Sequence, residues 1–306
     1  MSRNGVVVKV PGKVNLQLAV GPLESDGYHE ITTIFQAISI FDDVTVRYGT
    51  PNTGISLNIV GPTASGVPTD EKNLAYQAAK LMVTRYGISE DISINLRKEI
   101  PVAGGMAGGS ADAAGVLVGI DSLFELGLSR DELEKVASEL GSDVPFAISG
   151  GVAIGRGHGD VITPALYRGS YHWVLALSGQ GLSTPAVYKE CDRLREGLDI
   201  AKPQVSTSLL QSLGAGNPYE TGKALSNDLQ AAACSLRPAL RLVLEVGKEY
   251  GVLGGIVSGS GPTVAFLVED DEKSLDLSVA LSASGVVAGV ARATGPVPGA
   301  RVVETL

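Results

Sequence analysis

The chain has 306 residues, which exceeds one ordinary hydrophobic core and predicts two lobes, with the ligand site in the cleft between them. Hydrophobic residues make up 44% of the sequence and charged residues 19%, which excludes a disordered protein. The formal net charge of -9 argues against nonspecific nucleic-acid binding, so a phosphate pocket has to be a local positive exception.

The cysteines, histidines and apolar stretches argue against redox, zinc-binding, secreted and membrane proteins. Cys191 and Cys234 have no metal or redox spacing and are expected to be buried thiols in a reducing compartment. The three histidines form no zinc motif. The N-terminus carries no secretion signal, and the uncharged stretch 250–268 has a Ser-Gly-Pro centre that would break a membrane helix. We therefore expect a cytoplasmic protein without a membrane or nucleic-acid partner.

The apolar patterns predict hairpin-like strands and separate helices. The first half is expected to form strands at 6–10, 14–19, 31–40, 43–48, 55–60 and 92–96, and helices at 73–85, 111–123 and 129–140. The second half is expected to form strands at 172–177, 253–257, 264–268 and 286–291, helices at 185–195, 228–235, 238–250 and 271–283, and a looser polar segment up to about 222. This mixture predicts an α+β fold. The strand-like, glycine-rich stretch 151–159 sets the lobe boundary, giving lobes of residues 1–158 and 159–306.

The glycine-rich stretch 101–114, PVAGGMAGGSADAA, follows a strand and opens a helix. Unpaired N–H groups and the positive end of the helix dipole make such a start an anion site, most simply for phosphate. It is not a Walker A loop, because Ser110 stands where the lysine should be, and Met106 breaks the dinucleotide fingerprint. Alternatively, the glycines let the helix pack closely on a sheet and Ser110 is an N-cap. The loop alone leaves both interpretations open.

Three segments read together resemble a known family. They are Pro-Gly-Lys-Val-Asn-Leu at 11–16, the glycine-rich loop, and Gly-Ile-Val-Ser-Gly-Ser-Gly-Pro-Thr at 255–263. In this order they resemble the superfamily of galactokinase, homoserine kinase, mevalonate kinase and phosphomevalonate kinase. Within it, Gly-Tyr-His-Glu at 27–30 and Gly-Ser-Asp-Val-Pro-Phe at 141–146 resemble the 4-diphosphocytidyl-2-C-methyl-D-erythritol kinases.

This resemblance implies a fold and an activity. The fold would be the two-lobed α+β fold of these small-molecule kinases, with ATP bound by residues 1–158 and the substrate by residues 159–306. The activity would be ATP-dependent phosphorylation of the 2-hydroxyl of 4-diphosphocytidyl-2-C-methyl-D-erythritol, in the non-mevalonate pathway to isoprenoid precursors.

Two catalytic residues follow from the resemblance. Asp143 matches the general base that takes the proton of the acceptor hydroxyl. Lys13 would lie beside it, keep it ionised and stabilise charge during phosphoryl transfer. The alternatives are a turn or cap aspartate and a solvated lysine, which we would prefer without the resemblance.

The resemblance also assigns the ATP site. The phosphates would lie against the loop, and Asn73 would line the adenine pocket, although a helix cap explains Asn73 equally well. Mg²⁺ is implied by ATP; Ser110 is a candidate ligand, and no acidic ligand is assigned. The loop residues so assigned are Pro101, Val102, Ala103, Gly104, Gly105, Met106, Ala107, Gly108, Gly109, Ser110 and Ala111.

The substrate site follows in the same way. Tyr28 and His29 match the contacts of the family with cytidine, Asn15 matches a hydrogen-bonding position, and Tyr188 could complete a sandwich around the base. Alternatively, both tyrosines are half-buried core residues. The resemblance also places three residues near the substrate phosphates and the reacting centre, namely Gly259, Ser260 and Gly261.

Several residues and alternatives stay outside this assignment. Arg156 and His158 match no pattern of the family, and Arg97 and Lys98 are expected to be solvated. A hydrolase is one competing function, with Ser110 as nucleophile followed by Asp160 and His172. A noncatalytic nucleotide-binding protein or a sister kinase acting on mevalonate or homoserine is another. We expect a monomer or a weak homodimer.

Overall fold

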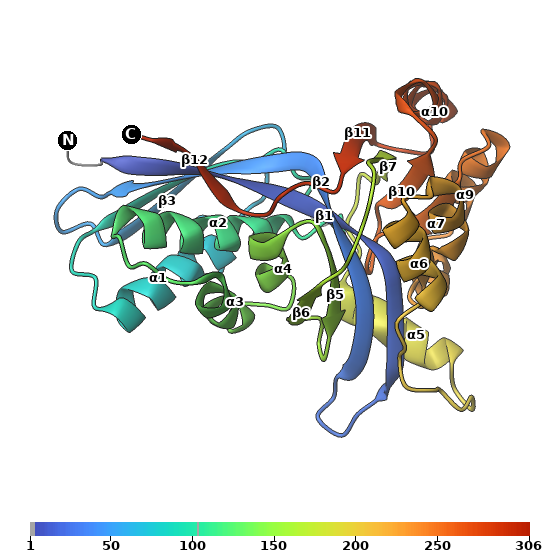
Figure 1. Cartoon of the computed structure of the whole chain (residues 1–306), viewed down its shortest axis with the longest axis horizontal. Helices are drawn as coiled ribbons and strands as arrows, with labels where there is room; N and C mark the ends of the chain where they lie inside the picture. Colours follow the sequence, from blue (N-terminus) through green and yellow to red (C-terminus); the bar gives the residue numbers. More distant parts are fainter. Residues whose placement is uncertain (1–3, 103) are drawn as a thin grey trace.

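The computed structural model describes residues 4–102 and 104–306, and in this part of the chain the strands form two sheets (Figure 1). The eight-stranded sheet has the central order β12-β1-β2-β4-β3, and the four-stranded sheet has the order β11-β7-β10-β9. The first sheet consists of β1 (Gly5–Leu23), β2 (His29–Tyr48), β3 (Ile55–Val60), β4 (Ile92–Arg97), β5 (Val152–Arg156), β6 (Val161–Pro164), β8 (Ser226–Asn227) and β12 (Arg301–Thr305). The second consists of β7 (Tyr171–Leu177), β9 (Gly254–Val257), β10 (Val264–Val268) and β11 (Gly289–Gly295).

A long antiparallel hairpin, β1 with β2, is the backbone of the first lobe, and its turn lies beside the second lobe (Figure 1). Each strand was predicted as two shorter strands, which is wrong. Pro11 stays in the ladder opposite Phe41, and a register shift between Pro11 and Gly12 absorbs the irregularity. Because proline cannot donate a ladder hydrogen bond, such a shift is what allows the strand to continue past it.

Helices cover one face of the first sheet. They are α1 (Leu74–Tyr86), α2 (Gly108–Leu123), α3 (Arg130–Ser138) and α4 (Val144–Ser149). Two glycines of α2 allow it to lie close to the sheet: a Cβ atom at Gly115 would come within 2.5 Å of Val44, and one at Gly119 within 2.5 Å of Val46. Ser129 and Glu132 form a capping box at the start of α3, at the end where the helix 129–140 was predicted to begin.

The second lobe packs six helices around the four-stranded sheet in the described residues. They are α5 (Thr184–Leu194), α6 (Thr207–Ala215), α7 (Pro218–Ala224), α8 (Gln230–Leu236), α9 (Ala239–Glu249) and α10 (Asp271–Ser284). The looser segment expected up to 222 is wrong, because α6 and α7 occupy it. Ser206 caps α6 through the Leu209 N–H, and Asn217 caps α7. The α4 helix and the short strands β6, β8 and β12 were also not predicted.

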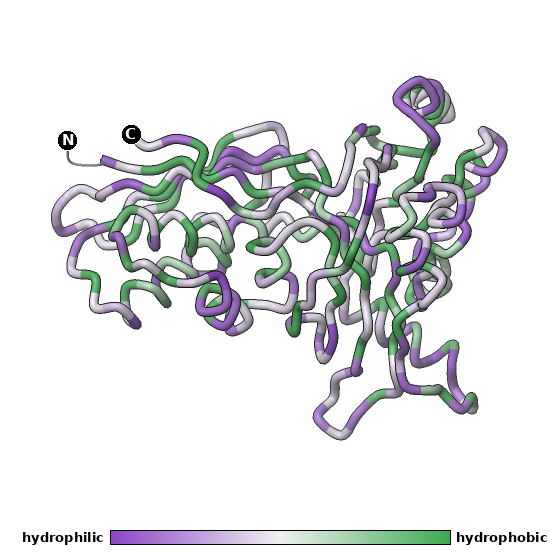
Figure 2. Tube along the Cα trace, viewed as in Figure 1, coloured by the Kyte–Doolittle hydropathy of each residue, from purple (hydrophilic) through white to green (hydrophobic). Residues whose placement is uncertain are grey.

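Hydrophobic stretches run along the strands of both lobes, and the outer turns of α3 and α10 are hydrophilic (Figure 2). The chain does not stay in the second lobe: β12 returns to pair with β1. The expected lobe boundary at 158/159 falls in the turn between β5 and β6.

Cys191 and Cys234 are buried free thiols, as predicted. Among the described helices, none combines the length and apolarity that crossing a membrane requires.

Candidate active site

The three segments that carry the resemblance meet at one place. The Lys13 N–H donates to the Met106 carbonyl at 3.2 Å, which ties β1 to the glycine-rich loop. On the other side of this loop, Thr263 N–H donates to Gly104 at 3.3 Å, and the Ser258 hydroxyl donates to Gly105 at 3.1 Å. Backbone hydrogen bonds therefore hold the glycine-rich loop between the lysine strand and the second-lobe loop 258–263.

The glycine-rich loop is shaped by close approach and left-handed backbone. Gly105 has a φ of +76°, and a Cβ atom there would lie 2.2 Å from the Ser258 carbonyl, so only glycine fits. Ala107 also has a positive φ, +58°, and occupies the N-cap position of α2 without a capping side chain. Ser110 lies inside the first turn, so the N-cap interpretation of Ser110 is wrong. Ala103 lies outside the described residues.

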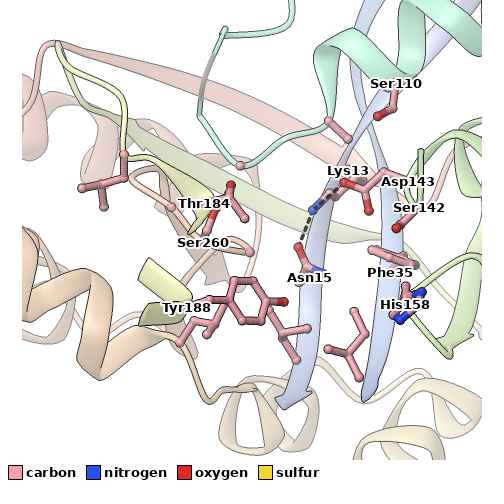
Figure 3. Close-up of a pocket in the computed structure, with 18 residues that line it drawn as sticks. Lys13, Asn15, Phe35, Ser110, Ser142, Asp143, His158, Thr184, Tyr188 and Ser260 are labelled. Atoms are coloured by element: carbon pink, nitrogen blue, oxygen red, sulfur yellow. Dashed lines mark hydrogen bonds and ion pairs between the residues drawn. The ribbon is translucent and has the colours of Figure 1, made fainter. Parts of the chain in front are cut away.

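The start of α2 borders a cavity of about 380 Å³, the central cavity, which contains the predicted catalytic pair (Figure 3). The first N–H groups of a helix have no acceptor within it, so this end of α2 offers positive partial charge. The residues that line the central cavity are Lys13, Asn15, Leu18, Ile31, Phe35, Gly105, Ala107, Ser110, Ser142, Asp143, His158, Leu182, Thr184, Tyr188, Leu229, Gly259, Ser260 and Gly261.

Lys13 is a buried cation at the centre of this cavity. It is 5% exposed, so the solvated interpretation is wrong. Its Nζ lies 3.6 Å from Asp143 Oδ2 and donates to Asn15 Oδ1 at 2.5 Å. Asn15 in turn donates to Thr33 at 2.8 Å, which fixes its amide. Figure 3 shows Lys13 between Asn15 and Asp143.

Asp143 is available for chemistry. It occupies the N-cap position of α4, yet its carboxylate makes no capping hydrogen bond. Its side chain is 33% exposed and faces the Lys13 ammonium group. The cap interpretation therefore does not describe this carboxylate, which combines a cationic neighbour with access to the cavity.

A second cavity of about 780 Å³, the aromatic cavity, adjoins the central one and shares Ile31, Ser142, His158, Thr184 and Tyr188 with it. Its other lining residues are Leu23, Gly27, Tyr28, His29, Pro185, Lys189 and Asp192.

Aromatic rings gather along the wall of the aromatic cavity. Tyr28 is 64% exposed, so it is no core residue, and its ring lies 5.3 Å from that of His158. The ring of His29 lies 5.2 Å from that of Tyr188. Tyr188 packs partly against the core of the second lobe, and burial, helped by the Asp143 charge, raises its pKa to about 12. The tyrosine therefore stays neutral and presents an uncharged ring.

A third cavity of about 240 Å³, the helix cavity, lies on the other side of the glycine-rich loop. Asn73 lines it and also caps α1 by accepting from the Ala75 N–H at 2.9 Å, so its two interpretations coexist. Consecutive residues divide between the cavities: Ala107 and Ser110 line the central one, whereas Gly108 and Gly109 line this one. The remaining lining residues are Gly66, Val67, Pro68, Lys72, Leu74, Lys98, Val102 and Asp112.

Lys98 corrects another expectation, because it is 1% exposed rather than solvated. Its Nζ donates to Asp42, to Asp112 Oδ2 at 2.7 Å and to the Gly108 carbonyl at 3.2 Å. The other oxygen of Asp42 accepts from the N–H groups of Glu99 and Ile100 at 2.6 and 2.9 Å. This cluster of Asp42, Lys98 and Asp112 joins β2, the end of β4 and the start of α2, so it sets the position of the loop between them.

Charge and burial have opposite effects on the pKa values of Lys98 and Asp112. Burial alone would lower the pKa of Lys98, but the charges of Asp112 and Asp42 outweigh it, and the pKa is raised. Burial raises the pKa of Asp112 to about 8 against the opposing charge of Lys98, and Asp42 adds to the rise. Asp112 Oδ1 has no hydrogen-bond partner among the described residues. Lys98 therefore stays a cation between the two carboxyl groups.

Two family models match the sequence. The model described as GHMP kinases N terminal domain matches residues 73–151, and the model described as GHMP kinases C terminal matches residues 209–287. The chain belongs to the GHMP kinase family. This GHMP kinase is 53% identical over 299 residues to the 4-diphosphocytidyl-2-C-methyl-D-erythritol kinase of Mycobacterium tuberculosis, covering 98% of this chain and 93% of the relative. The protein of the same name from Mycolicibacterium smegmatis is 50% identical, with 99% and 94% covered.

Solved structures agree. A crystal structure of 4-(cytidine 5'-diphospho)-2C-methyl-D-erythritol kinase matches this GHMP kinase with a TM-score of 0.76 and 30% identity, covering 94% of this chain and 98% of the other. The homoserine kinase of Cytophaga hutchinsonii matches with a TM-score of 0.77 at 18% identity, covering 99% and 98%, which shows the fold alone. The predicted resemblance, the α+β kinase fold and the enzyme class of small-molecule kinase are confirmed.

The hydrolase alternative is wrong for this GHMP kinase. Ser110 lines the central cavity, but neither Asp160 nor His172 is among its lining residues. Several polar lining residues of the cavities were not assigned as site residues from the sequence, among them Ser142, His158, Thr184 and Asp192. Ser142 could have been found as the neighbour of Asp143. Thr184, which bonds the Ser260 hydroxyl at 2.8 Å, gives no such signal, because these residues are 76 positions apart.

Proposed function

We propose that this kinase transfers the γ-phosphoryl group of ATP to the 2-hydroxyl of 4-diphosphocytidyl-2-C-methyl-D-erythritol, a step towards isoprenoid precursors. The observation that carries the proposal is the Lys13–Asp143 pair, which lies in the cavity between the start of α2 and the aromatic cavity. Relatives 53% identical over 98% of the chain carry the name of this activity. The three cavities then hold, in spatial order, the adenine, the reacting groups and the cytidyl unit.

ATP would bind to the first lobe. The adenine enters the helix cavity beside Asn73, and the phosphates lie against the amides from Gly104 to Ala111. The positive end of α2 and the buried Lys13 supply the positive potential that an acidic chain needs at this place. The cluster of Asp42, Lys98 and Asp112 would support the loop, because it joins the first turn of α2 to β2 and to the end of β4.

Mg²⁺ would accompany ATP. Among the described residues, no group of three or more Asp, Glu, His or Cys side chains is placed to hold a metal ion. The central cavity offers the Ser110 hydroxyl and the Asp143 carboxylate, a donor set that fits an ion coordinated mainly by phosphate oxygens and water. Bound there, with Ser110 as its protein ligand, the ion would neutralise charge on the phosphates.

The chemistry needs alignment and one proton transfer. Asp143 accepts the proton of the attacking hydroxyl, and its carboxylate is not occupied by a cap. The Lys13 ammonium group, 3.6 Å away, keeps negative charge favourable on Asp143 and on the transferring phosphoryl group. Asn15 holds Lys13 in place through its fixed amide.

The acceptor would occupy the aromatic cavity. Its cytosine would stack between Tyr28 and Tyr188 beside His29, and each stacking contact is worth about 1 to 3 kcal/mol. Gly259, Ser260 and Gly261 border the central cavity from the second lobe, where they approach the diphosphate and the reacting centre. A cytoplasmic location and a monomer or weak homodimer complete the proposal.

The test is product analysis with ATP and a panel of acceptor alcohols. The panel contains 4-diphosphocytidyl-2-C-methyl-D-erythritol, mevalonate and homoserine, and mass spectrometry locates the new phosphate. We expect a product from the cytidyl alcohol alone. Phosphorylation of mevalonate or homoserine with no cytidyl product would replace the proposal by a sister kinase, and no product from any alcohol would leave a noncatalytic nucleotide-binding protein.

A further inference from the structure

His29 and Asp192 form a contact that joins the two lobes in the wall of the aromatic cavity. His29 begins β2, Asp192 lies in α5, and the distance between His29 Nε2 and Asp192 Oδ1 is 2.8 Å. His29 is 8% exposed, whereas the Asp192 side chain keeps 38% of its surface. Asp192 stands four residues after Tyr188, so both lie on one face of α5, and both contact the imidazole ring. The ring is therefore held from two sides.

The hydrogen-bond partner of His29 Nε2 determines whether the other ring nitrogen, Nδ1, can accept a hydrogen bond. A neutral imidazole has one N–H, and a carboxylate can only accept a hydrogen bond. Asp192 therefore places the proton of the neutral ring on Nε2, which leaves Nδ1 with a free lone pair. Among the described residues, no hydrogen bond to Nδ1 is formed, so this acceptor is left for a ligand.

An acceptor in this wall discriminates between pyrimidines. Cytosine carries an amino donor at position 4, whereas uracil carries a carbonyl acceptor there. A lone pair that faces this position gains a hydrogen bond from cytosine, but it faces an oxygen in uracil and leaves two polar groups unpaired. Which base fits thus depends on the tautomer of His29.

We propose that Asp192 is a positioning residue that fixes the His29 proton on Nε2, so that Nδ1 accepts from the 4-amino group of cytosine and disfavours uracil. The proposal rests on the proposed function, because it assumes that the aromatic cavity receives the cytosine. It adds a residue outside every sequence motif, and it explains how a partly exposed carboxylate could set the specificity of a cavity that otherwise offers mainly stacking surfaces.

The first experiment measures binding of CDP and UDP by calorimetry, which does not depend on turnover. Wild type should bind CDP at least about tenfold more tightly than UDP. Asp192→Asn keeps size and packing, but its amide can also donate to Nε2 and so permits the other tautomer. In this variant the preference should fall to about threefold or less. Glu196→Gln, an exposed residue just after α5, removes one negative charge as the matched control and should leave the preference unchanged.

The second experiment reads the tautomer directly. Nitrogen-15 NMR distinguishes a protonated from a bare ring nitrogen, and the chain has three histidines, so His29→Gln assigns the signal. In the neutral ring of wild type, the proton should lie on Nε2. Asp192→Asn should shift signal towards the Nδ1–H form.

The outcomes separate two claims. An unchanged CDP preference in Asp192→Asn, or an Nδ1–H ring in wild type, would overturn the role of Asp192. Equal affinity of wild type for CDP and UDP would overturn it as well. Turnover of the cytidyl alcohol by wild type is assayed in parallel: if it is absent while the binding preference depends on Asp192, the proposed reaction fails and the positioning role stands.

Discussion

A general base has to be reachable, correctly placed and free of other duties. Asp143 meets these requirements because it borders the central cavity, lies 3.6 Å from Lys13 and leaves the α4 cap unbonded. An aspartate at an N-cap position normally stabilises its helix through the backbone N–H groups that follow. Its failure to do so here indicates that position 143 is used for something other than helix stability.

Asp143→Asn is therefore expected to fold normally and lose activity. Removing a general base costs about 100- to 10,000-fold in rate, so kcat should fall by this factor while the KM for ATP changes little. The melting temperature should stay close to that of wild type, since no capping bond is lost. Steady-state kinetics and thermal unfolding measure both. Asp270→Asn is the matched control, because it makes the same substitution at another N-cap position. Asp270 caps α10 by accepting from the Lys273 N–H, and the variant should keep the kcat of wild type. A kcat near wild type in Asp143→Asn would remove the base assignment.

Residues of the site differ in how visible they are in the sequence. Lys13 and Asp143 each belong to a contiguous motif, so their roles could be predicted from local pattern. Lys98 could not, because a lysine beside a strand is usually solvated, and its partners Asp42 and Asp112 lie 56 and 14 positions away. The pairing of β2 with β4 brings Asp42 to Lys98, and the packing of α2 adds Asp112.

At the scale of elements, the start of α2 depends on what lies behind it. The cluster of Asp42, Lys98 and Asp112 ties the strand end at Glu99 and Ile100 to the first turn of α2. Breaking a buried ion pair by removing one partner is costly, at about 3 to 5 kcal/mol, whereas exchanging a carboxylate for an amide preserves shape and removes charge. The cluster can therefore be tested through its protonation.

Asp112→Asn is expected to change how stability depends on pH. The pKa of Asp112 is about 8 in the folded protein against an ordinary value of 3.8. The folded state thus binds more protons than the unfolded state between these values, and the contribution of Asp112 to stability falls as the pH rises from about 4 to about 8. Asp112→Asn has no carboxyl group at this position, so its stability does not decrease with pH for this reason. Its melting temperature relative to wild type should therefore rise steadily between pH 5 and pH 8.

The control for this series is Asp131→Asn, an exposed residue in the first turn of α3. It loses the same charge without the buried environment, so its difference from wild type should stay nearly constant over the same pH range. If the melting-temperature difference between Asp112→Asn and wild type also stayed constant with pH, Asp112 would be ionised over the whole range. The cluster would then contain two charged carboxylates.

Most elements could be predicted from periodicity, but three kinds could not. The halves of β1 and β2 were separated because Pro11 and the polar residues near Asp42 break the alternation, whereas the sheet carries the strands past them. The helices α6 and α7 lie in a polar stretch, and only the caps at Ser206 and Asn217 mark their starts. The strand β12 depends on a partner almost 300 residues away in the chain, β1, which no local pattern specifies.

At the scale of the whole molecule, one hydrophobic cluster extends through both lobes, beside a second cluster that lies mostly in the second lobe. Val8 and Ile94 of the first sheet belong to the same buried cluster as Trp173 and Leu267 of the second. A polar contact crosses the same junction: the Trp173 indole N–H donates to Gln36 Oε1 at 2.7 Å. The central cavity is thus lined by two lobes that one hydrophobic cluster joins, and this limits how far the lobes can open.

Because of this shared cluster, the lobes are expected to unfold together. The only tryptophan, Trp173, reports on the junction, and circular dichroism reports on the helices and strands of both lobes. Urea unfolding followed by tryptophan fluorescence and by circular dichroism should therefore give coincident transitions. Gln36→Ala, which leaves the buried indole N–H unpaired, should lower both midpoints equally and cost about 1 to 3 kcal/mol. Gln211→Ala, at an exposed position of α6, should move neither. A fluorescence transition at lower urea than the circular dichroism transition would mean that the junction opens first and that the lobes do not unfold together.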